Sequence, residues 1–127
     1  MNKAILCVDD ERIILESLKY QLNKTFGNDF ILEFAESGIE AIEIIDEFIN
    51  DDIDLLLIIS DYLIPNMDGE ELIKIVKNKH PHINVIMLTG QANSTVLAEM
   101  TERKLLNKVI SKPWSEEELI KVVKSYI

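Results

Sequence analysis

Five short apolar runs alternate along this chain with longer segments whose apolar residues recur at helical spacing. The runs occupy residues 4–8, 30–35, 53–60, 85–89 and 109–111. Four of the five are almost continuously apolar, which is typical of strands in a parallel sheet that helices cover on both faces. The run at residues 30–35 alternates more between apolar and polar residues, and this pattern predicts a strand at the edge of the sheet.

The segments between the runs predict five amphipathic helices. Their apolar residues lie three and four positions apart, in stripes that contain Leu18, Ile45, Ile73, Leu97 and Val123. Three of these helices begin with a capping box, in which a Ser or Asp side chain accepts a backbone N–H and a later Glu reaches back. The pairs are Ser37 with Glu40, Asp68 with Glu71, and Ser115 with Glu118. The caps and the apolar stripes agree on where these helices begin.

This alternation of strands and helices also limits the fold. Successive parallel strands require right-handed crossovers, and five strands are too few for a closed eight-stranded barrel. We therefore expect an α/β fold: a doubly wound, flavodoxin-like parallel sheet of five strands in the order 2-1-3-4-5, with five helices in a three-layer α/β/α sandwich. The 127 residues fit a single domain over residues 1–127. In such folds, ligands bind at the carboxyl ends of the strands.

The excess of acidic residues excludes several classes of function. The chain has 13 basic and 23 acidic residues, for a net charge of −10. Such a surface repels both nucleic acid and anionic membranes, so we expect no direct contact with either. Cys7 is the only cysteine, which excludes an internal disulfide, and the sequence has neither a signal-peptide pattern nor a membrane-length apolar stretch. We therefore expect a cytoplasmic protein.

Charged and polar residues gather where the predicted strands end. They are Asp9, Asp10 and Glu11 after the first strand, Asp61 after the third, Thr89 after the fourth and Lys112 after the fifth. Taken singly, each could cap a helix, stabilise a turn or face solvent. Together, the carboxylates need a counter-charge, because two like charges about 4 Å apart cost on the order of 4 kcal/mol at an effective dielectric constant near 20. Mg²⁺ meets this need, since it prefers carboxylate and phosphate oxygens.

The same cluster suits phosphoryl chemistry. An aspartate carboxylate can act as a nucleophile toward a phosphoryl group and form an acyl phosphate. Phosphoryl transfer depends mainly on positioning and on neutralising charge, which a cation and Lys112 would supply. The hydroxyl of Thr89 could donate to a further phosphoryl oxygen. The predicted rim of the sheet therefore indicates an aspartate that accepts phosphoryl groups.

Four motifs, each at the end of its strand, carry a resemblance to a known family. They are the apolar run into Asp9-Asp10; Ile58-Ile59-Ser60-Asp61 followed by Pro65-Asn66-Met67-Asp68-Gly69; Met87-Leu88-Thr89-Gly90; and Ile110-Ser111-Lys112-Pro113. Over essentially its whole length, the chain resembles the response-regulator receiver domains of bacterial two-component signalling, of the chemotaxis-regulator type. Four motifs in this order make the resemblance highly specific.

The resemblance implies a signalling domain rather than a metabolic enzyme. Asp61 would accept a phosphoryl group from a histidine kinase or phosphotransfer protein, and Thr89 and Lys112 would contact the phosphoryl oxygens. The domain would assist its own phosphorylation and dephosphorylation, and the acyl phosphate would change the binding of a partner or of an output domain. The Lys112–Pro113 peptide bond is expected to be cis.

The resemblance also implies a set of ligands for Mg²⁺. Asp10 and Asp61 would bind the ion directly, Asp9 would bind it largely through water, and the backbone carbonyl of Leu63 would be the third protein ligand. Leu63 and Gln91 occupy positions that tune the lifetime of the acyl phosphate in this family.

One residue departs from the family pattern. Receivers commonly carry Tyr or Phe three residues before the lysine, and this chain has Val109 there. We therefore expect the signal to pass through backbone shifts in the loop after Thr89 rather than through rotation of an aromatic ring. Receivers often pair through the face of the fourth helix, fifth strand and fifth helix, so a homodimer through that face is a further expectation.

Other functions on a similar sheet fit the residues less well. A haloacid-dehalogenase-type phosphatase needs an Asp-x-Asp pair after the first strand, whereas this chain offers Asp9 and Glu11 and leaves Asp61 without a role. A flavin-binding protein needs a first loop that cradles a phosphate, which Asp9, Asp10 and Glu11 would repel. A receiver that docks partners without phosphorylation does not explain the acidic cluster, although Val109 is compatible with it.

Overall fold

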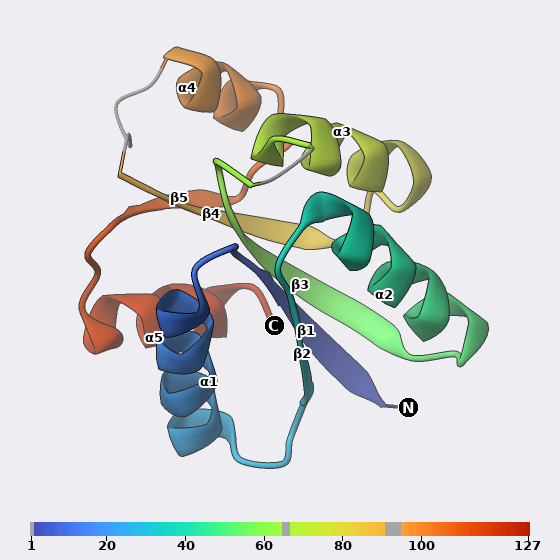
Figure 1. Cartoon of the computed structure of the whole chain (residues 1–127), viewed down its shortest axis with the longest axis vertical. Coiled ribbons are helices and arrows are strands. Elements are labelled where there is room, and N and C mark those ends of the chain that lie inside the picture. The colour runs from blue at the N-terminus through green and yellow to red at the C-terminus, as the bar shows by residue number, and fades with distance from the viewer. Residues whose placement is uncertain (1, 65–66, 91–94) are drawn as a thin grey trace.

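Five parallel strands form the centre of the molecule, with helices on both faces of the sheet (Figure 1). The computed structural model describes residues 2–64, 67–90 and 95–127. The strands are β1 (Lys3–Val8), β2 (Ile31–Ala35), β3 (Asp54–Asp61), β4 (Asn84–Thr89) and β5 (Lys108–Ser111). The helices are α1 (Arg12–Phe26), α2 (Gly38–Asn50), α3 (Gly69–Lys79), α4 (Thr95–Glu102) and α5 (Glu116–Ser125).

The strand order is β2-β1-β3-β4-β5, and every neighbouring pair is parallel. This order confirms the predicted doubly wound fold and places the alternating strand β2 at an edge. The apolar runs predicted from the sequence agree with the observed strands to within one residue at every end. The sequence located the strands well because β1, β3 and β4 are buried along most of their length and are therefore almost continuously apolar, while β5 is short and lies at the other edge.

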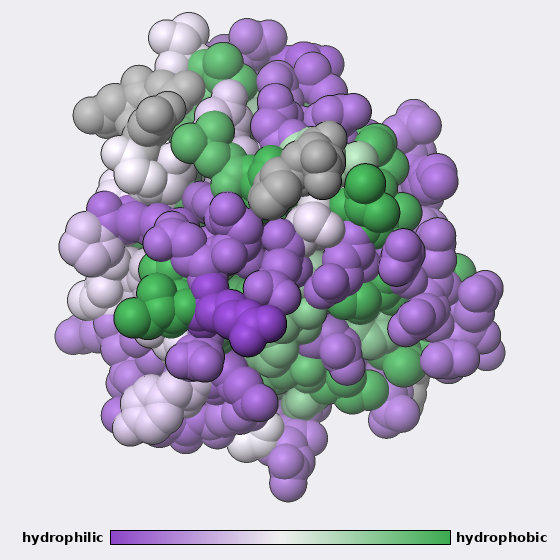
Figure 2. Space-filling view, in the orientation of Figure 1, coloured by the Kyte–Doolittle hydropathy of each residue, from purple (hydrophilic) through white to green (hydrophobic). Residues whose placement is uncertain are grey.

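Two hydrophobic clusters lie on opposite faces of the sheet. Helices α1 and α5 cover one face, and α2, α3 and α4 cover the other (Figure 1). Along β1 the side chains alternate between the clusters: Leu6 and Val8 belong to one and Ile5 and Cys7 to the other. Cys7 is fully buried, as expected for a core residue, and burial raises the pKa of its thiol far above the ordinary value. The apolar side chains that remain visible in Figure 2 lie among a mainly hydrophilic surface.

The three predicted caps begin α2, α3 and α5. The side chains of Ser37, Asp68 and Ser115 each accept a hydrogen bond from the backbone N–H three residues on, at 3.1, 2.8 and 3.1 Å. The reciprocal bond of α2 differs from the usual capping box, because the Glu40 carboxylate accepts from the N–H of Glu36, one residue before the cap. Among the described helices, none combines the length and the apolar character needed to cross a bilayer.

Candidate functional site

The sequence-predicted polar residues meet at the edge of the sheet where the strands end. The register pairs Val8 of β1 with Ser60 of β3, so the residues that follow them, Asp9 and Asp61, lie side by side. One carboxylate oxygen from each of Asp9, Asp10 and Asp61 lies within 4.8 Å of the other two. In Figure 1 this is the side of the sheet on which α1 begins. The fold thus brings Asp61 to the adjacent pair Asp9 and Asp10, from which it is far apart in the sequence.

Lys112 joins two of these carboxylates. Its Nζ lies 2.8 Å from Oδ2 of Asp9 and 3.2 Å from Oδ1 of Asp61. Glu11 is more distant, at 3.8 Å, and its side chain is exposed. The backbone N–H of Lys112 donates to the carbonyl of Thr89 at 2.9 Å, which ties the end of β5 to the end of β4. The peptide bond between Lys112 and Pro113 is cis, as expected.

Asp9 and Asp10 lie next to each other in the sequence but in different environments. Asp9 is fully buried, and both of its carboxylate oxygens have partners: Oδ2 accepts from Lys112 and Oδ1 accepts from the backbone N–H of Glu11 at 2.9 Å. Asp10 is exposed. The Asp10 carboxylate is therefore the more accessible of the two to a ligand that arrives from solvent.

The rim carries more negative than positive charge. Burial raises the pKa of the Asp61 carboxyl above its ordinary value, and the charge of Asp9 raises it further, while the Lys112 ammonium opposes both effects. Burial lowers the pKa of Lys112, but hydrogen bonds and charge from Asp9 and Asp61 outweigh it, so this pKa lies above its ordinary value. One ammonium thus balances only part of the charge of three carboxylates. A hard divalent cation fits this donor set, because all three side chains offer oxygen atoms.

The remaining predicted residues surround this cluster. Thr89 is buried at the end of β4, and the neighbouring carbonyl of Leu88 accepts from the N–H of Tyr62 at 3.2 Å. Leu63 lies two residues beyond Asp61, with 59% of its surface exposed. Three residues named above, Pro65, Asn66 and Gln91, lie outside the described part of the chain.

Gly69 is a site residue whose role the sequence did not reveal. A Cβ at this position would lie 2.8 Å from the backbone oxygen of Asp61 and 3.0 Å from the Cα of Tyr62. The N–H of Gly69 also donates to the carbonyl of Tyr62 at 2.7 Å. Only a residue without a side chain allows α3 to begin this close to the backbone at Asp61. The signal in the sequence was a glycine directly after a helix cap. Glycine is a poor helix former, so helix propensity does not explain its presence at this position.

Comparisons with known proteins agree with this geometry. A family model for the response regulator receiver domain matches residues 5–124. Sporulation initiation phosphotransferase F of Bacillus subtilis is 30% identical over 128 residues, which cover 100% of this chain and 95% of that protein. Sensor kinase CckA of Brucella abortus is 30% identical over 126 residues, which cover 99% of this chain and 13% of that protein.

A solved structure supports the same assignment. It is a CheY-like response regulator receiver domain protein from Methanospirillum hungatei, and it aligns with a TM-score of 0.82 and 28% identity over 98% of this chain and 93% of that chain. The acidic pocket of Asp9, Asp10 and Asp61 fits the phosphorylation site of such a domain. The chain therefore belongs to the response regulator receiver domain family of two-component systems.

Proposed function

We propose that Asp61 accepts a phosphoryl group and that the rest of the rim assists this transfer and the later hydrolysis. The observation that carries the proposal is the cluster of three carboxylates within 4.8 Å of one another, with Lys112 in contact with two of them. In the transfer, a carboxylate oxygen of Asp61 bonds to the phosphorus, and the bond between phosphorus and the donor breaks. Hydrolysis then returns the carboxylate and releases inorganic phosphate. The domain turns over no other product.

Asp10, Asp61 and the backbone carbonyl of Leu63 would hold Mg²⁺ directly, and Asp9 would hold it through water. The exposure of Asp10 and the complete hydrogen bonding of Asp9 support this division between the two neighbours. When bound, Mg²⁺ would neutralise charge on the carboxylates and on the phosphoryl oxygens.

Lys112 and Thr89 would contact the phosphoryl group from the protein side. The Lys112 ammonium already lies 3.2 Å from Oδ1 of Asp61, so a phosphoryl group on this aspartate would be within its reach. Its raised pKa keeps it charged at neutral pH, as this role requires. Thr89 ends β4, the strand next to β3, and its hydroxyl would donate to a further phosphoryl oxygen.

The phosphoryl donor would be a histidine kinase or a phosphotransfer protein, and the domain would act in the cytoplasm as one unit over residues 1–127. Family membership supports these statements, and the likeness to a protein named as a phosphotransferase supports the first of them. The acyl phosphate would change the binding of a partner, of an output domain, or of a second copy through the face of α4, β5 and α5.

Val109 would alter how this signal leaves the site. It is half-buried on β5 and packs against the cluster under α2, α3 and α4. A valine has no ring that can move between inward and outward positions, so the change would pass through the backbone after Thr89. If phosphorylation altered partner binding only after Val109→Tyr, this route would be wrong.

Intact mass spectrometry tests the proposal. The protein is incubated with acetyl phosphate, with and without Mg²⁺, beside the Asp61→Asn variant. The expected result is a gain of one phosphoryl group that requires both Mg²⁺ and Asp61. If the wild-type protein binds Mg²⁺ by calorimetry but gains no mass, a docking domain that works without phosphorylation replaces this proposal.

A further inference from the structure

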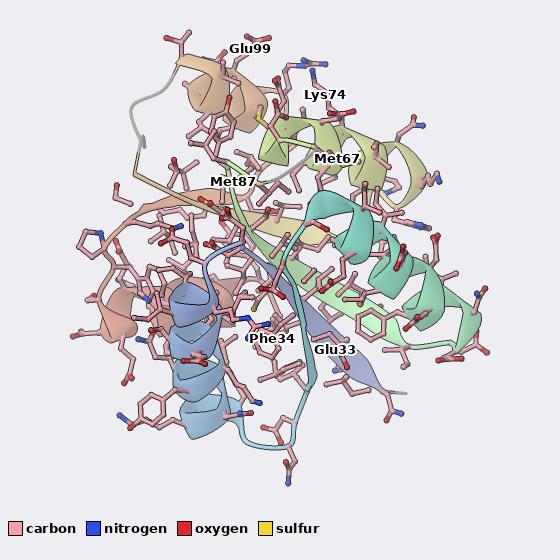
Figure 3. The ribbon with its side chains drawn as sticks, in the orientation of Figure 1. Glu33, Phe34, Met67, Lys74, Met87 and Glu99 are labelled. Carbon is pink, nitrogen blue, oxygen red and sulfur yellow. The ribbon has the colours of Figure 1, made fainter. Side chains whose placement is uncertain are left out.

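Met67 packs on the first residue of α2, although the two positions are far apart in the sequence. Figure 3 shows Met67 between α3 and the start of α2. The contact is close: a Cβ added to Gly38 would lie 2.9 Å from Sδ, 3.0 Å from Cβ and 3.2 Å from Cγ of Met67. Gly38 is buried, so solvent does not occupy the space that a side chain at this position would fill. Gly38 therefore forms a seat into which the Met67 side chain fits.

The chain beyond Met67 is fixed at the phosphoacceptor. Asp68 caps α3, and Gly69 then lies against the backbone of Asp61 and Tyr62, with its N–H bonded to the Tyr62 carbonyl. Only one residue separates Met67 from Gly69. A displacement of Met67 is therefore transmitted directly to the backbone that leaves β3.

We propose that Gly38 and Met67 are positioning residues for the metal site. By seating the Met67 side chain on α2, they set the path of the backbone after Asp61 and thereby the direction of the Leu63 carbonyl. This inference rests on the proposed function, in which that carbonyl is a ligand for Mg²⁺. Neither residue touches the ion or the phosphoryl group.

The expected effect follows from the distances. Non-bonded carbon atoms pack at about 3.5–4.0 Å, so a methyl group at position 38 would push Met67 away by roughly 0.5 Å or more. Because the Cβ of Met67 is among the crowded atoms, rotation of the thioether alone does not relieve the contact. Binding sites must be held within about 0.5 Å, and Mg²⁺ accepts only near-octahedral geometry. Outer-shell changes typically weaken metal binding about 10–100-fold, so we expect a loss of about tenfold for Gly38→Ala.

A double-mutant cycle separates this role from a general loss of stability. Mg²⁺ affinity is measured by calorimetry for the wild-type protein, Gly38→Ala, Met67→Gly and the double variant. Glycine at position 67 removes the crowded Cβ together with the thioether, so the methyl group added at position 38 no longer meets a side chain there. Gly38→Ala should therefore weaken affinity about tenfold in the wild-type background and less than about twofold in the Met67→Gly background. Equal losses in both backgrounds, or none in either, would overturn the proposal.

Gly27→Ala serves as the matched control. Gly27 ends α1 with a φ of +56°, and a Cβ there would meet nothing within 4 Å. Its substitution strains the backbone and lowers stability, but it lies at the end of α1 remote from the rim and should leave Mg²⁺ affinity unchanged. A similar loss of affinity in this control would show that destabilisation alone weakens the site.

Amide hydrogen exchange of Gly69 provides a readout that does not depend on the ion. In metal-free protein, Gly38→Ala should speed this exchange by loosening the bond to the Tyr62 carbonyl, whereas Gly27→Ala should speed it no more than its global loss of stability predicts. Unchanged exchange in Gly38→Ala would refute the seat. If the wild-type protein bound no Mg²⁺, the proposed function would fail. The Gly69 exchange rate in metal-free protein would still show whether Met67 is seated on Gly38.

Discussion

Neutralising Asp61 should stabilise the metal-free protein. The carboxyl is buried beside Asp9, and its raised pKa means that the folded protein disfavours the charged form. Asparagine has nearly the same shape and no charge. The substitution Asp61→Asn therefore removes a cost that the wild-type protein bears at neutral pH.

The distances give the magnitude of this cost. Because one carboxylate oxygen from each aspartate lies within 4.8 Å of the other two, Asp9 and Asp10 each repel Asp61 by about 3.5 kcal/mol at an effective dielectric constant near 20. The Lys112 ammonium lies 3.2 Å from Asp61 and attracts this carboxylate by about 5 kcal/mol at the same dielectric constant. Water screens the exposed Asp10, while burial adds to the cost, so we expect a net gain of about 1–2 kcal/mol on substitution. For a domain of this size that corresponds to a rise in Tm of about 4–8 °C.

Thermal unfolding in EDTA measures this difference, and its dependence on pH identifies the cause. The folded pKa of Asp61 lies above the unfolded value, so the folded wild-type protein binds the extra proton between these two pKa values. Wild-type stability therefore falls as the pH rises through this window, whereas Asp61→Asn lacks this contribution. The advantage of the variant should be full once the pH exceeds the folded pKa of Asp61 and should disappear as the pH falls toward about 3.9, the ordinary pKa of an aspartate.

Mg²⁺ should reverse the order of the two proteins. An ion that binds only the folded state stabilises it by an amount that grows with the ion concentration relative to the dissociation constant, and Asp61→Asn would remove one of the proposed ligands. If Asp61→Asn instead lowered the Tm at pH 7 in EDTA, attraction to Lys112 would outweigh burial and repulsion, and the electrostatic account of the rim would be wrong.

Three further changes test other contacts. Lys112→Met should destabilise the protein at pH 7 by about 3–5 kcal/mol, because it leaves the fully buried Asp9 without its ammonium partner; urea unfolding that showed a loss below 1 kcal/mol would contradict this. Gly69→Ala should cost about 1–3 kcal/mol despite the better helix propensity of alanine, because its Cβ would meet the backbone oxygen of Asp61 at 2.8 Å; an unchanged urea midpoint would show that α3 simply moves. Ser115→Ala should cost about 1 kcal/mol through loss of the α5 cap while leaving Mg²⁺ affinity unchanged by calorimetry; altered affinity would link this cap to the site.

The sequence predicted the fold and the members of the rim because both depend on local patterns. Apolar runs of strand length located the strands, and the parallel topology then brought the residues after them to one edge. Each of Asp9, Asp61 and Lys112 could therefore be placed without any knowledge of distances. The edge position of β2 was predictable for the same reason, since its alternating pattern reflects its partial exposure.

Contacts between helices and loops could not be predicted in this way. The seat of Met67 on Gly38 depends on how closely α2 approaches the segment before α3, and no periodic pattern encodes that separation. The unequal environments of Asp9 and Asp10 depend on where the Lys112 side chain lies, which the strand pattern does not determine. Tertiary packing decides both features.

The ion pair between Lys112 and Asp9 joins residues 103 positions apart, so the site requires almost the entire chain. A ribosome releases the three aspartates well before this lysine: at about 5–20 residues per second, the interval between Asp61 and Lys112 is about 3–10 s. During that interval the nascent chain holds the carboxylates without their ammonium partner. If Lys112 assists phosphoryl transfer as proposed, newly made protein becomes competent for signalling only after β5 has left the ribosome, and incomplete translation products do not compete for the phosphoryl donor.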